Sequence, residues 1–210
     1  MRLPALLAAL LLSASAAKAD VAGEFDYYVM ALSWTPNWCA LEGDSRGEAR
    51  CARGGGHGWS LHGLWPQYES GWPDYCRTRE RDPSRAMTAS MDDIMGSAGL
   101  AWHQWKKHGR CSGLSARAYY DLSRQAFGSV KMPEVFEKLD RAVQLPARVV
   151  EEAFLEANPG LRPEMVTVTC RRNDIQEVRI CLTKDLSPRS CGRDVSRDCS
   201  LNKANLAPPR

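Results

Sequence analysis

The segment WHQWKKHGRC, Trp102–Cys111, says more about the fold and the site than any other stretch of the chain. A helix turns about 100° per residue, so four polar side chains of this segment would share one arc about 140° wide. These side chains are His103, Lys107, Gln104 and His108. The two tryptophans fall on the remaining arc, where we expect them to pack into the core, and Gly109 is suited to end the helix. The simpler alternative is a solvent-exposed polar face, which explains the lysines better than the histidines.

A second segment, WSLHGLW (residues 59–65), alternates in the manner of a strand that Pro66 should end. His62 is either a catalytic group or a hydrogen-bonded structural histidine, and the glycine after it can open space for a ligand. Trp65 is either a stacking surface for a nucleobase or a core residue. Strict alternation would direct His62 and Trp65 to opposite faces of the strand. Both can serve one site only if Pro66 turns the chain early or the strand has other bounds.

The remaining elements indicate one α+β domain. Strands are expected at residues 25–34 (FDYYVMALSW), 164–170 (EMVTVTC) and 177–182 (EVRICL), the last two forming a pair across residues 171–176. Helices are expected at residues 115–130, capped by Ser115, and at residues 146–160, beginning at Pro146. Loops are expected at residues 39–57, 67–85 and from Lys184 onward. Since no repeat or linker interrupts this order, we expect a single domain at residues 20–210, with a largely antiparallel central sheet and flanking helices.

Residues 1–19 are typical of a secretory signal peptide. Arg2 is followed by the apolar run LPALLAALLLSASAA and by AKA at residues 17–19, so cleavage is expected after Ala19. A membrane anchor is the alternative, but the run falls short of the roughly 20 apolar residues that span a bilayer. We therefore expect a secreted or periplasmic protein that has no membrane anchor after cleavage.

The charge balance excludes a broad nucleic-acid-binding face. Loss of the leader removes two basic residues and no acidic ones, so the net charge falls from +3 to about +1. Proteins that bind phosphate backbones through a whole face carry a clear excess of lysine and arginine. Any polyanion must therefore be held by a few local charges.

All eight cysteines lie after the leader, and their even number in an exported chain predicts four disulfides. Zinc binding is the alternative, but the sequence contains no CxxC or HxxxH pair. Eight cysteines allow 105 pairings, among which the sequence alone does not choose. The cysteines are Cys39, Cys51, Cys76, Cys111, Cys170, Cys181, Cys191 and Cys199.

Two histidines and a lysine without a metal fit one reaction well. Imidazole exists in either protonation state near neutral pH, so one histidine can accept a proton while another donates one. A further cation can stabilise the charge that develops on phosphoryl oxygens. Cleavage of RNA by its own 2′-hydroxyl uses these groups and leaves a 2′,3′-cyclic phosphate, which can then be hydrolysed to a 3′-phosphate. DNA lacks the nucleophile and would not be cut.

Taken together, the two segments resemble the ribonuclease T(2) family, the secreted transferase-type endoribonucleases. WSLHGLWP, Trp59–Pro66, matches the family's first active-site motif, and WHQWKKHGRC matches the second. A looser resemblance extends from Phe25 to about Cys199 and includes LSWTPNWC and the paired late strands. The resemblance implies an α+β fold, RNA as substrate and no metal or other cofactor. No obligate protein partner is indicated, and we expect a monomer.

The resemblance also implies roles for single residues. His62 and His108 correspond to the acid–base pair, with His108 usually the base and His62 the acid, although the sequence does not test that order. Other matched positions concern the substrate: His103 and Lys107 for phosphate, Trp65 for base stacking, and Gln67 as a candidate selector of the base. The implied disulfides are Cys39–Cys51, Cys76–Cys111 and Cys170–Cys199, the last enclosing Cys181–Cys191.

Two positions depart from the family pattern. The family usually has glutamate where Gln104 stands and threonine where Arg110 stands. Without that carboxylate, neighbouring imidazoles lack a negative charge that would raise their pKa, and Lys107 keeps more of its charge for phosphate. The Gln104 amide can still donate a hydrogen bond to a phosphoryl oxygen, so we include it in the catalytic group. We expect retained activity with an altered pH profile.

Two other classes of function compete with an endoribonuclease. One is a catalytically weakened RNA-binding or effector protein on the same fold, for which Gln104 leaves room. The other is a metal-dependent phosphoesterase, which the lack of a ligand cluster in the sequence disfavours. Base preference and the physiological RNA are not indicated by the sequence.

Overall fold

The central element of the fold is a six-stranded sheet in a computed structural model that describes residues 20–55 and 57–210. The expected signal segment, residues 1–19, lies outside the described residues. The strand order is β2-β1-β5-β6-β3, with β4 also paired to β5, and all pairs are antiparallel except a single β5–β6 contact. The strands are β1 (Tyr27–Trp34), β2 (Trp59–Gln67), β3 (Val143–Leu145), β4 (Val166–Arg171), β5 (Asp174–Leu182) and β6 (Ala204–Leu206). The structure therefore confirms the predicted α+β class with a largely antiparallel sheet.

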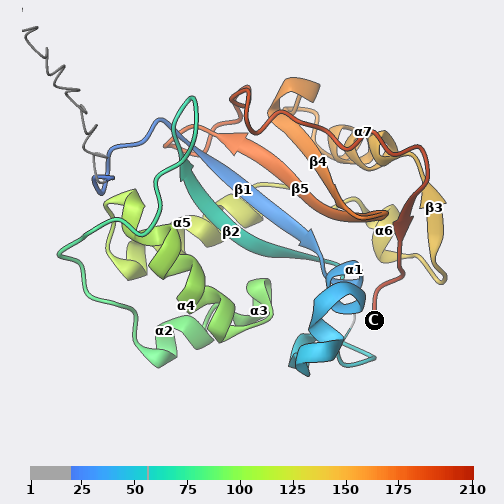
Figure 1. Ribbon diagram of the computed structural model, residues 1–210, viewed down its shortest axis with the longest axis horizontal. Helices are drawn as coiled ribbons and strands as arrows, with labels where there is room; N and C mark the ends of the chain where they lie inside the picture. Colours follow the sequence, from blue (N-terminus) through green and yellow to red (C-terminus); the bar gives the residue numbers. More distant parts are fainter. Residues whose placement is uncertain (1–19, 56) are drawn as a thin grey trace, which may run out of the picture.

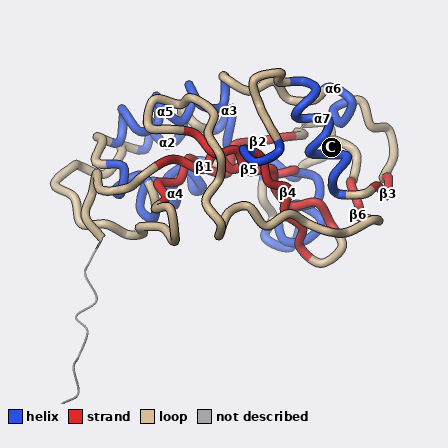
Figure 2. The backbone as a smooth tube through the Cα atoms, turned by 90° about the horizontal axis from the view of Figure 1, so that it is seen from above, coloured by secondary structure: helices blue, strands red, loops and turns tan. Residues whose placement is uncertain are grey.

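Helices pack mainly against one face of this sheet. Figure 2 shows α3, α5, α6 and α7 on one side of the strands, and Figure 1 shows α4 running beside β2. The helices are α1 (Thr35–Trp38), α2 (Arg85–Ala89), α3 (Asp92–Met95), α4 (Ala98–Lys107), α5 (Ala116–Gly128), α6 (Glu134–Glu137) and α7 (Ala147–Ala157). Within the described part of the chain, no helix is long and apolar enough to cross a membrane.

The two faces of the sheet differ because strand residues alternate. On β1, the side chains of Tyr28, Met30, Leu32 and Trp34 belong to the main hydrophobic core under the helices. Their neighbours Tyr27 and Val29 belong to a smaller cluster on the opposite face, with Cys181 and Val195. The second face therefore holds little apolar packing, and most of it is available for polar side chains.

Several predicted elements are confirmed and others are wrong in their bounds. The Ser115 side chain caps α5 by accepting a hydrogen bond from the Ala118 N–H, as its sequence position predicts. The described residues of the expected loop at 39–57 instead contain a π-helical turn and two 3₁₀ turns, and the π-helical turn begins directly after α1. β3 and β6 were not expected, since each has only three residues and depends on its partner strand.

The structure contains four disulfides, and their pairing is the one that the family resemblance implies. The bridges are Cys39–Cys51, Cys76–Cys111, Cys170–Cys199 and Cys181–Cys191. Two of them hold the C-terminal tail against the sheet, because Cys170 and Cys181 lie on β4 and β5. The bridge to Cys111 fixes the chain just beyond α4.

Candidate active site

A β-bulge at His62 places the first motif on one face of the sheet. Ala31 of β1 pairs with Gly63 and Leu32 pairs with Leu61, so His62 is the extra residue on β2. The extra residue resets the alternation, and the His62 and Trp65 rings meet on the same face with centroids 5.2 Å apart. The expectation that Pro66 ends the strand is wrong, because β2 continues to Gln67. Proline is tolerated there since β2 is the edge strand of the sheet.

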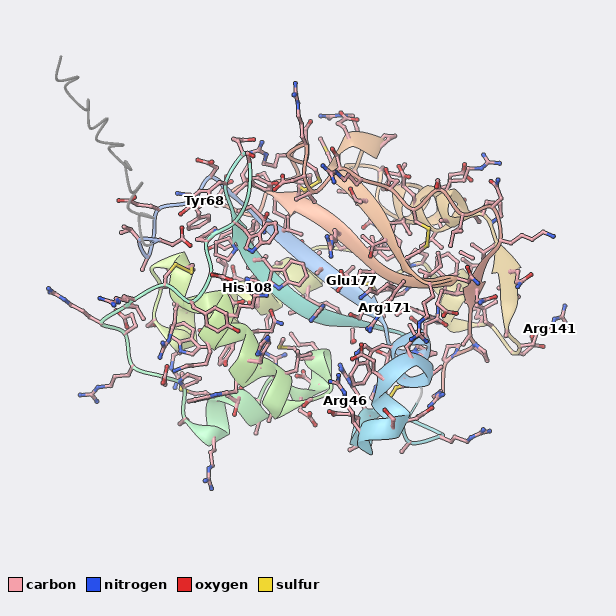
Figure 3. All side chains as sticks on the ribbon, viewed as in Figure 1. Arg46, Tyr68, His108, Arg141, Arg171 and Glu177 are labelled. Carbon is pink, nitrogen blue, oxygen red and sulfur yellow. A yellow bond between two sulfur atoms is a disulfide. The ribbon has the colours of Figure 1, made fainter. Side chains whose placement is uncertain are left out.

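The second motif reaches the same face because α4 lies across the β2 edge. One side of α4 joins the main core through Ala101 and Trp105. The other side faces a cavity of about 370 Å³, which all seven site residues predicted from the sequence line together. They are His62, Trp65 and Gln67 from β2, and His103, Gln104, Lys107 and His108 from the end of α4. Figure 3 labels His108 in the central part of the molecule, near the end of α4.

His108 is a buried imidazole that stays neutral over a wide pH range. Its side chain stacks on Trp65, with ring centroids 5.2 Å apart and an interplanar angle of 27°. Burial lowers the pKa of His108 to about 3, and the positive charges of Lys107, His62 and His103 act in the same direction. Among the described residues, nothing accepts or donates a hydrogen bond at its buried Nδ1. A neutral imidazole at the cavity wall is suited to accept a proton.

Glu177 is the site residue that sequence reasoning missed. It lies on β5, is only 1% exposed, and its Oε1 lies 2.5 Å from Nδ1 of His62. Arg179, two residues further along the same strand, donates two hydrogen bonds to the other carboxylate oxygen, Oε2. A signal was available in the sequence, because two charged residues at positions i and i+2 share one face of the predicted strand EVRICL, residues 177–182, which is otherwise apolar. Figure 3 labels Glu177 over the sheet.

The Glu177 carboxylate is held in its ionised form. Burial would raise its pKa, but the hydrogen bond with His62 and the charges of His62 and Arg179 outweigh burial and lower the pKa to about 2. His62 and His108 therefore have contrasting surroundings. One imidazole contacts a carboxylate, whereas the other is buried beside cations.

Gln104 lies on the predicted helix face but is buried instead of being presented to solvent. Its Oε1 accepts a 2.7 Å hydrogen bond from the Trp65 indole N–H, so the amide Nε2 is directed away from the indole. A Cβ added at Gly63 would lie only 2.2 Å from the same oxygen, so glycine leaves the space that the Gln104 side chain needs. Gln104 therefore ties α4 to β2 and holds the Trp65 ring in place.

His103 and Lys107 occupy the more open side of the cavity. Partial burial lowers the pKa of His103, and the nearby Lys107 and His62 charges lower it further. Both residues lie one helical turn apart on α4, as the predicted arc requires. Two nitrogen groups therefore face the cavity from one helix, where an anion would be held by hydrogen bonds.

Three details of the second motif differ from expectation. Trp102 is 41% exposed and lies beneath Nζ of Lys106 instead of in the core. The helix ends at Lys107 and continues as a 3₁₀ turn, and the left-handed residue is Gly113, not Gly109. Glycine is required at 109 for another reason, because a Cβ there would lie 2.6 Å from the Trp105 ring.

Arg110, which stands where threonine is usual, pairs with a carboxylate outside the cavity. Its guanidinium donates a 2.7 Å hydrogen bond to Asp82. The same carboxylate also accepts from the Trp105 indole N–H and from Lys106. Arg110 is therefore part of a surface cluster that fixes the back of α4, and it does not contact the cavity.

The rest of the cavity is suited to a planar ligand beside Trp65. Gln67 is buried and lies on the same strand face as Trp65. Trp72, which is 55% exposed, and Asp194 contribute to the wall, although neither was singled out from the sequence. The Arg179 guanidinium lies over the Trp65 ring, 5.4 Å from its centroid. Within residues 20–55 and 57–210, no group of three or more His, Cys, Asp or Glu side chains is arranged to hold a metal ion.

Comparisons with known proteins agree with this architecture. The Ribonuclease T2 family matches residues 25–191. A ribonuclease from Aeromonas hydrophila is 49% identical over 119 residues, covering 56% of this chain and 52% of that protein. A probable ribonuclease from Haemophilus influenzae is 31% identical over 128 residues, covering 55% and 46%. The chain thus spans about half the length of these relatives. The solved structure of RNase NT in complex with 5′-AMP has a TM-score of 0.64 at 22% identity, covers 89% of this chain and 100% of its own, and shows likeness of fold alone.

Proposed function

This chain belongs to the Ribonuclease T2 family, and on that premise we propose that it is a metal-independent endoribonuclease of single-stranded RNA. The observation that supports the proposal most strongly is the cavity itself. It combines a neutral buried imidazole, a carboxylate-bound imidazole and a lysine within one space of about 370 Å³. These are the groups that an attack by the 2′-hydroxyl on the adjacent phosphorus requires.

In the proposed reaction His108 is the base and His62 is the acid. His108 takes the 2′-hydroxyl proton, the 2′-oxygen attacks phosphorus, and His62 protonates the departing 5′-oxygen. The low pKa of His108 keeps it unprotonated at neutral pH, the form in which a base must start, and also makes it a weaker base than an ordinary imidazole. His103 and Lys107 stabilise the charge that develops on the phosphoryl oxygens. The products are a 2′,3′-cyclic phosphate and then a 3′-phosphate.

We further propose that the base 5′ to the cleaved bond stacks on Trp65. The indole N–H donates to Gln104, one face of the ring stacks on His108, and the Arg179 guanidinium lies 5.4 Å from the ring centroid, so a base would stack on the part of the ring that these groups leave open to the cavity. Stacking of this kind is tolerant of sequence and contributes roughly 1–3 kcal/mol per base. Gln67 and Trp72 line the same cavity, where Gln67 could hydrogen-bond the base and Trp72 could pack against it. Gln104 affects the bound base indirectly, because its side-chain oxygen orients the Trp65 ring on which the base would stack. Its amide can also contact a phosphate oxygen directly.

The deciding experiment incubates RNA with the purified chain in EDTA. We expect cyclic-phosphate and 3′-phosphate ends, formed without metal and lost in both His62→Ala and His108→Ala. Bound but intact RNA would instead support an RNA-binding or effector protein on the same fold. Cutting that stops with EDTA would support a metal-dependent phosphoesterase. Dinucleotides of defined sequence would then measure base preference.

We also propose that the protein is exported as a monomer, to the periplasm or beyond the cell. Four disulfides support export, since such bonds persist in oxidising compartments. N-terminal sequencing of the mature protein is expected to begin at Asp20. Recovery of the protein with reduced cysteines from the cytosol would contradict this proposal, and light scattering tests the monomer.

A further inference from the structure

We propose that Glu177 is a positioning residue that holds His62 so that its Nε2–H points at the departing 5′-oxygen. The inference rests on the proposed function and deepens it, because it assigns how the acid is oriented. Nδ1 of His62 lies 2.5 Å from the Glu177 carboxylate, so Nε2 is the nitrogen left to face the cavity. As the P–O5′ bond breaks, the Nε2 proton moves to the 5′-oxygen. The Nδ1 proton stays on the imidazole and remains donated to Glu177.

The path from Glu177 to His62 exists because the strand between them carries small side chains. β1 separates β5 from β2, and on β1 Ser33 pairs with Glu177 while Ala31 pairs with Arg179. Neighbouring strands lie about 4.8 Å apart, so a contact between β5 and β2 must cross about 10 Å over β1. A larger side chain at residue 31 or 33 would stand in that path. The bulge at His62 completes the contact by directing the imidazole onto the same face.

Arg179 gives the carboxylate a second partner without competing with His62. Its guanidinium donates to Oε2 at 3.0 and 2.8 Å, whereas His62 uses Oε1. A carboxylate that is 1% exposed would be costly to ionise alone, and these partners compensate for its lost hydration. Glu177 consequently accepts the hydrogen bond and does not carry the proton away. Glu177 and Arg179 lie two residues apart on the same strand, so the strand backbone fixes the geometry of this ion pair.

Charged groups surround His62 from several elements. Glu177 and Arg179 face it from β5, whereas His103, Lys107 and His108 face it from the end of α4. Asp194 also lines the cavity, and an adjoining pocket that His62 shares is lined by further charged residues: Glu42, Arg46, Glu48 and Arg50 from the turns after α1, and Arg171 from β4. Of these groups, Glu177 is the anion hydrogen-bonded to His62, so Glu177→Gln replaces a charged acceptor with a neutral amide at Nδ1.

The test compares two substrates that differ only in the leaving group. A dinucleoside 3′,5′-phosphate needs a proton on its departing 5′-oxygen, whereas a nucleoside 3′-(4-nitrophenyl phosphate) releases nitrophenolate without one. General acids contribute roughly 10²–10⁴-fold, so we expect Glu177→Gln to lower kcat for the dinucleotide about 10- to 100-fold. On the aryl substrate it should stay within about threefold of wild type. His62→Ala should show the same selectivity, with a larger loss on the dinucleotide.

Asp93→Asn is the matched control. Asp93 forms a two-point ion pair with Arg124 on α5, so the variant also neutralises an arginine-bound carboxylate, but away from the cavity. It should leave the ratio of the two rates unchanged. Glu177→Asp, which keeps the charge on a shorter side chain, should recover part of the dinucleotide rate.

The outcomes separate this proposal from the function on which it depends. Equal losses of Glu177→Gln on both substrates, or no loss on either, would overturn the positioning role while leaving the ribonuclease proposal intact. A wild-type chain that cleaves neither substrate would overturn the function itself. If Glu177→Gln does not fold, the wild-type NMR spectrum serves instead: the His62 Nδ1–H should appear as a strongly deshielded proton. An exchange-averaged or Nε2-only tautomer would overturn the proposal.

Discussion

At the scale of single residues, the site depends on two imidazoles in opposite surroundings. His108 is buried, beside cations and an indole ring, whereas His62 is hydrogen-bonded to a buried carboxylate. A base must be free of its proton and an acid must hold one, so these surroundings suit the two roles that we propose. The difference arises from neighbours that are distant in sequence, because Glu177 lies 115 residues from His62.

The pH profile should reflect Gln104. With His108 at a pKa of about 3, the base remains unprotonated as pH falls, and wild-type kcat/KM should hold from neutral pH to about pH 4. Gln104→Glu keeps an oxygen for the Trp65 indole but adds a negative charge beside His108, which raises the pKa of His108. The acid limb should then move to higher pH. Steady-state cleavage of a dinucleotide between pH 3 and 8 checks this, and superimposable profiles would contradict it.

Burial of His108 should also make the fold sensitive to acid. The folded state binds the His108 proton only near pH 3, whereas the unfolded chain binds it near the ordinary value of 6.5. Between these values the unfolded state holds more protons, so the free energy of unfolding falls as pH falls. From pH 7 to 5 we expect a loss of about 1–2 kcal/mol, since the slope is at most about 1.4 kcal/mol per pH unit.

Urea denaturation at several pH values measures this loss. His108→Gln should flatten the slope between pH 6.5 and 5, a window above the ordinary range of the carboxyl groups. An equally steep slope in the variant would assign the acid sensitivity to other groups. Below about pH 4.5 protonation of Glu177 adds a loss of the same sign, because its folded pKa is lowered to about 2.

At the scale of elements, the bulged edge strand and α4 form one unit. The bulge brings His62 and Trp65 to one face of β2. Helix α4 covers that face and approaches the strand at Gly63, next to Gln104. A Cβ on Gly63 would lie 2.2 Å from the Gln104 Oε1 and 2.4 Å from the Trp65 Nε1. The hydrogen bond between these two side chains therefore depends on the missing side chain of Gly63.

Gly63→Ala should accordingly disturb the site. Overpacking of this kind costs about 1–3 kcal/mol, and we expect a similar loss of unfolding free energy with at least a tenfold lower kcat/KM. Gly128→Ala at the end of α5 is the matched control, because an added Cβ there meets nothing within 4 Å. That variant should keep its activity. Wild-type activity in Gly63→Ala would show that the Trp65–Gln104 contact is dispensable.

A second prediction at this scale concerns β1. Ala31 is fully buried and lies between Gly63 and Arg179 in neighbouring strands. Ala31→Leu should obstruct the space between β5 and β2, lowering dinucleotide kcat more than the rate on the aryl substrate. A Tm measurement separates the effect from general destabilisation, and an unchanged ratio of the two rates would contradict the crossing path.

At the scale of the whole molecule, disulfides join segments that lie apart in the sequence. Cys76–Cys111 closes 35 residues and ends three residues after His108, whereas Cys181–Cys191 closes only 10. In the chain-entropy account, the longer loop gives about 1 kcal/mol more stabilisation. The first bridge also fixes the turn that follows α4, so its loss should affect activity as well as stability.

The double variant Cys76→Ser/Cys111→Ser should lose about 2–4 kcal/mol of unfolding free energy and a measurable part of its kcat. Cys181→Ser/Cys191→Ser should lose less stability. Urea denaturation and dinucleotide cleavage below the unfolding transition compare the two. A larger loss for the shorter bridge would show that packing around Cys181, which is fully buried, outweighs loop length.

The sequence predicts most of this architecture because its main elements have local signals. Hydrophobic periodicity predicts β1, β4, β5, α5 and α7, and the polar arc predicts the end of α4. The short strands β3 and β6 lack such a signal, since three residues form a strand only when a partner is present. The same reasoning wrongly predicts that Trp102 is buried in the core. The width of the core-facing arc depends on what packs against the helix, and Trp102 lies outside it.

The sequence by itself determined the α+β class, the two motifs and the seven residues that meet at the cavity. Only the tertiary structure decided how those residues are held. The bulge aligns His62 with Trp65, the Trp65 indole N–H donates a hydrogen bond to Gln104, and the carboxylate of Glu177 contacts His62. Periodicity and motif spacing describe neighbours along the chain. Bulges and buried ion pairs depend on which strands lie side by side, and that is established only when the whole sheet has formed.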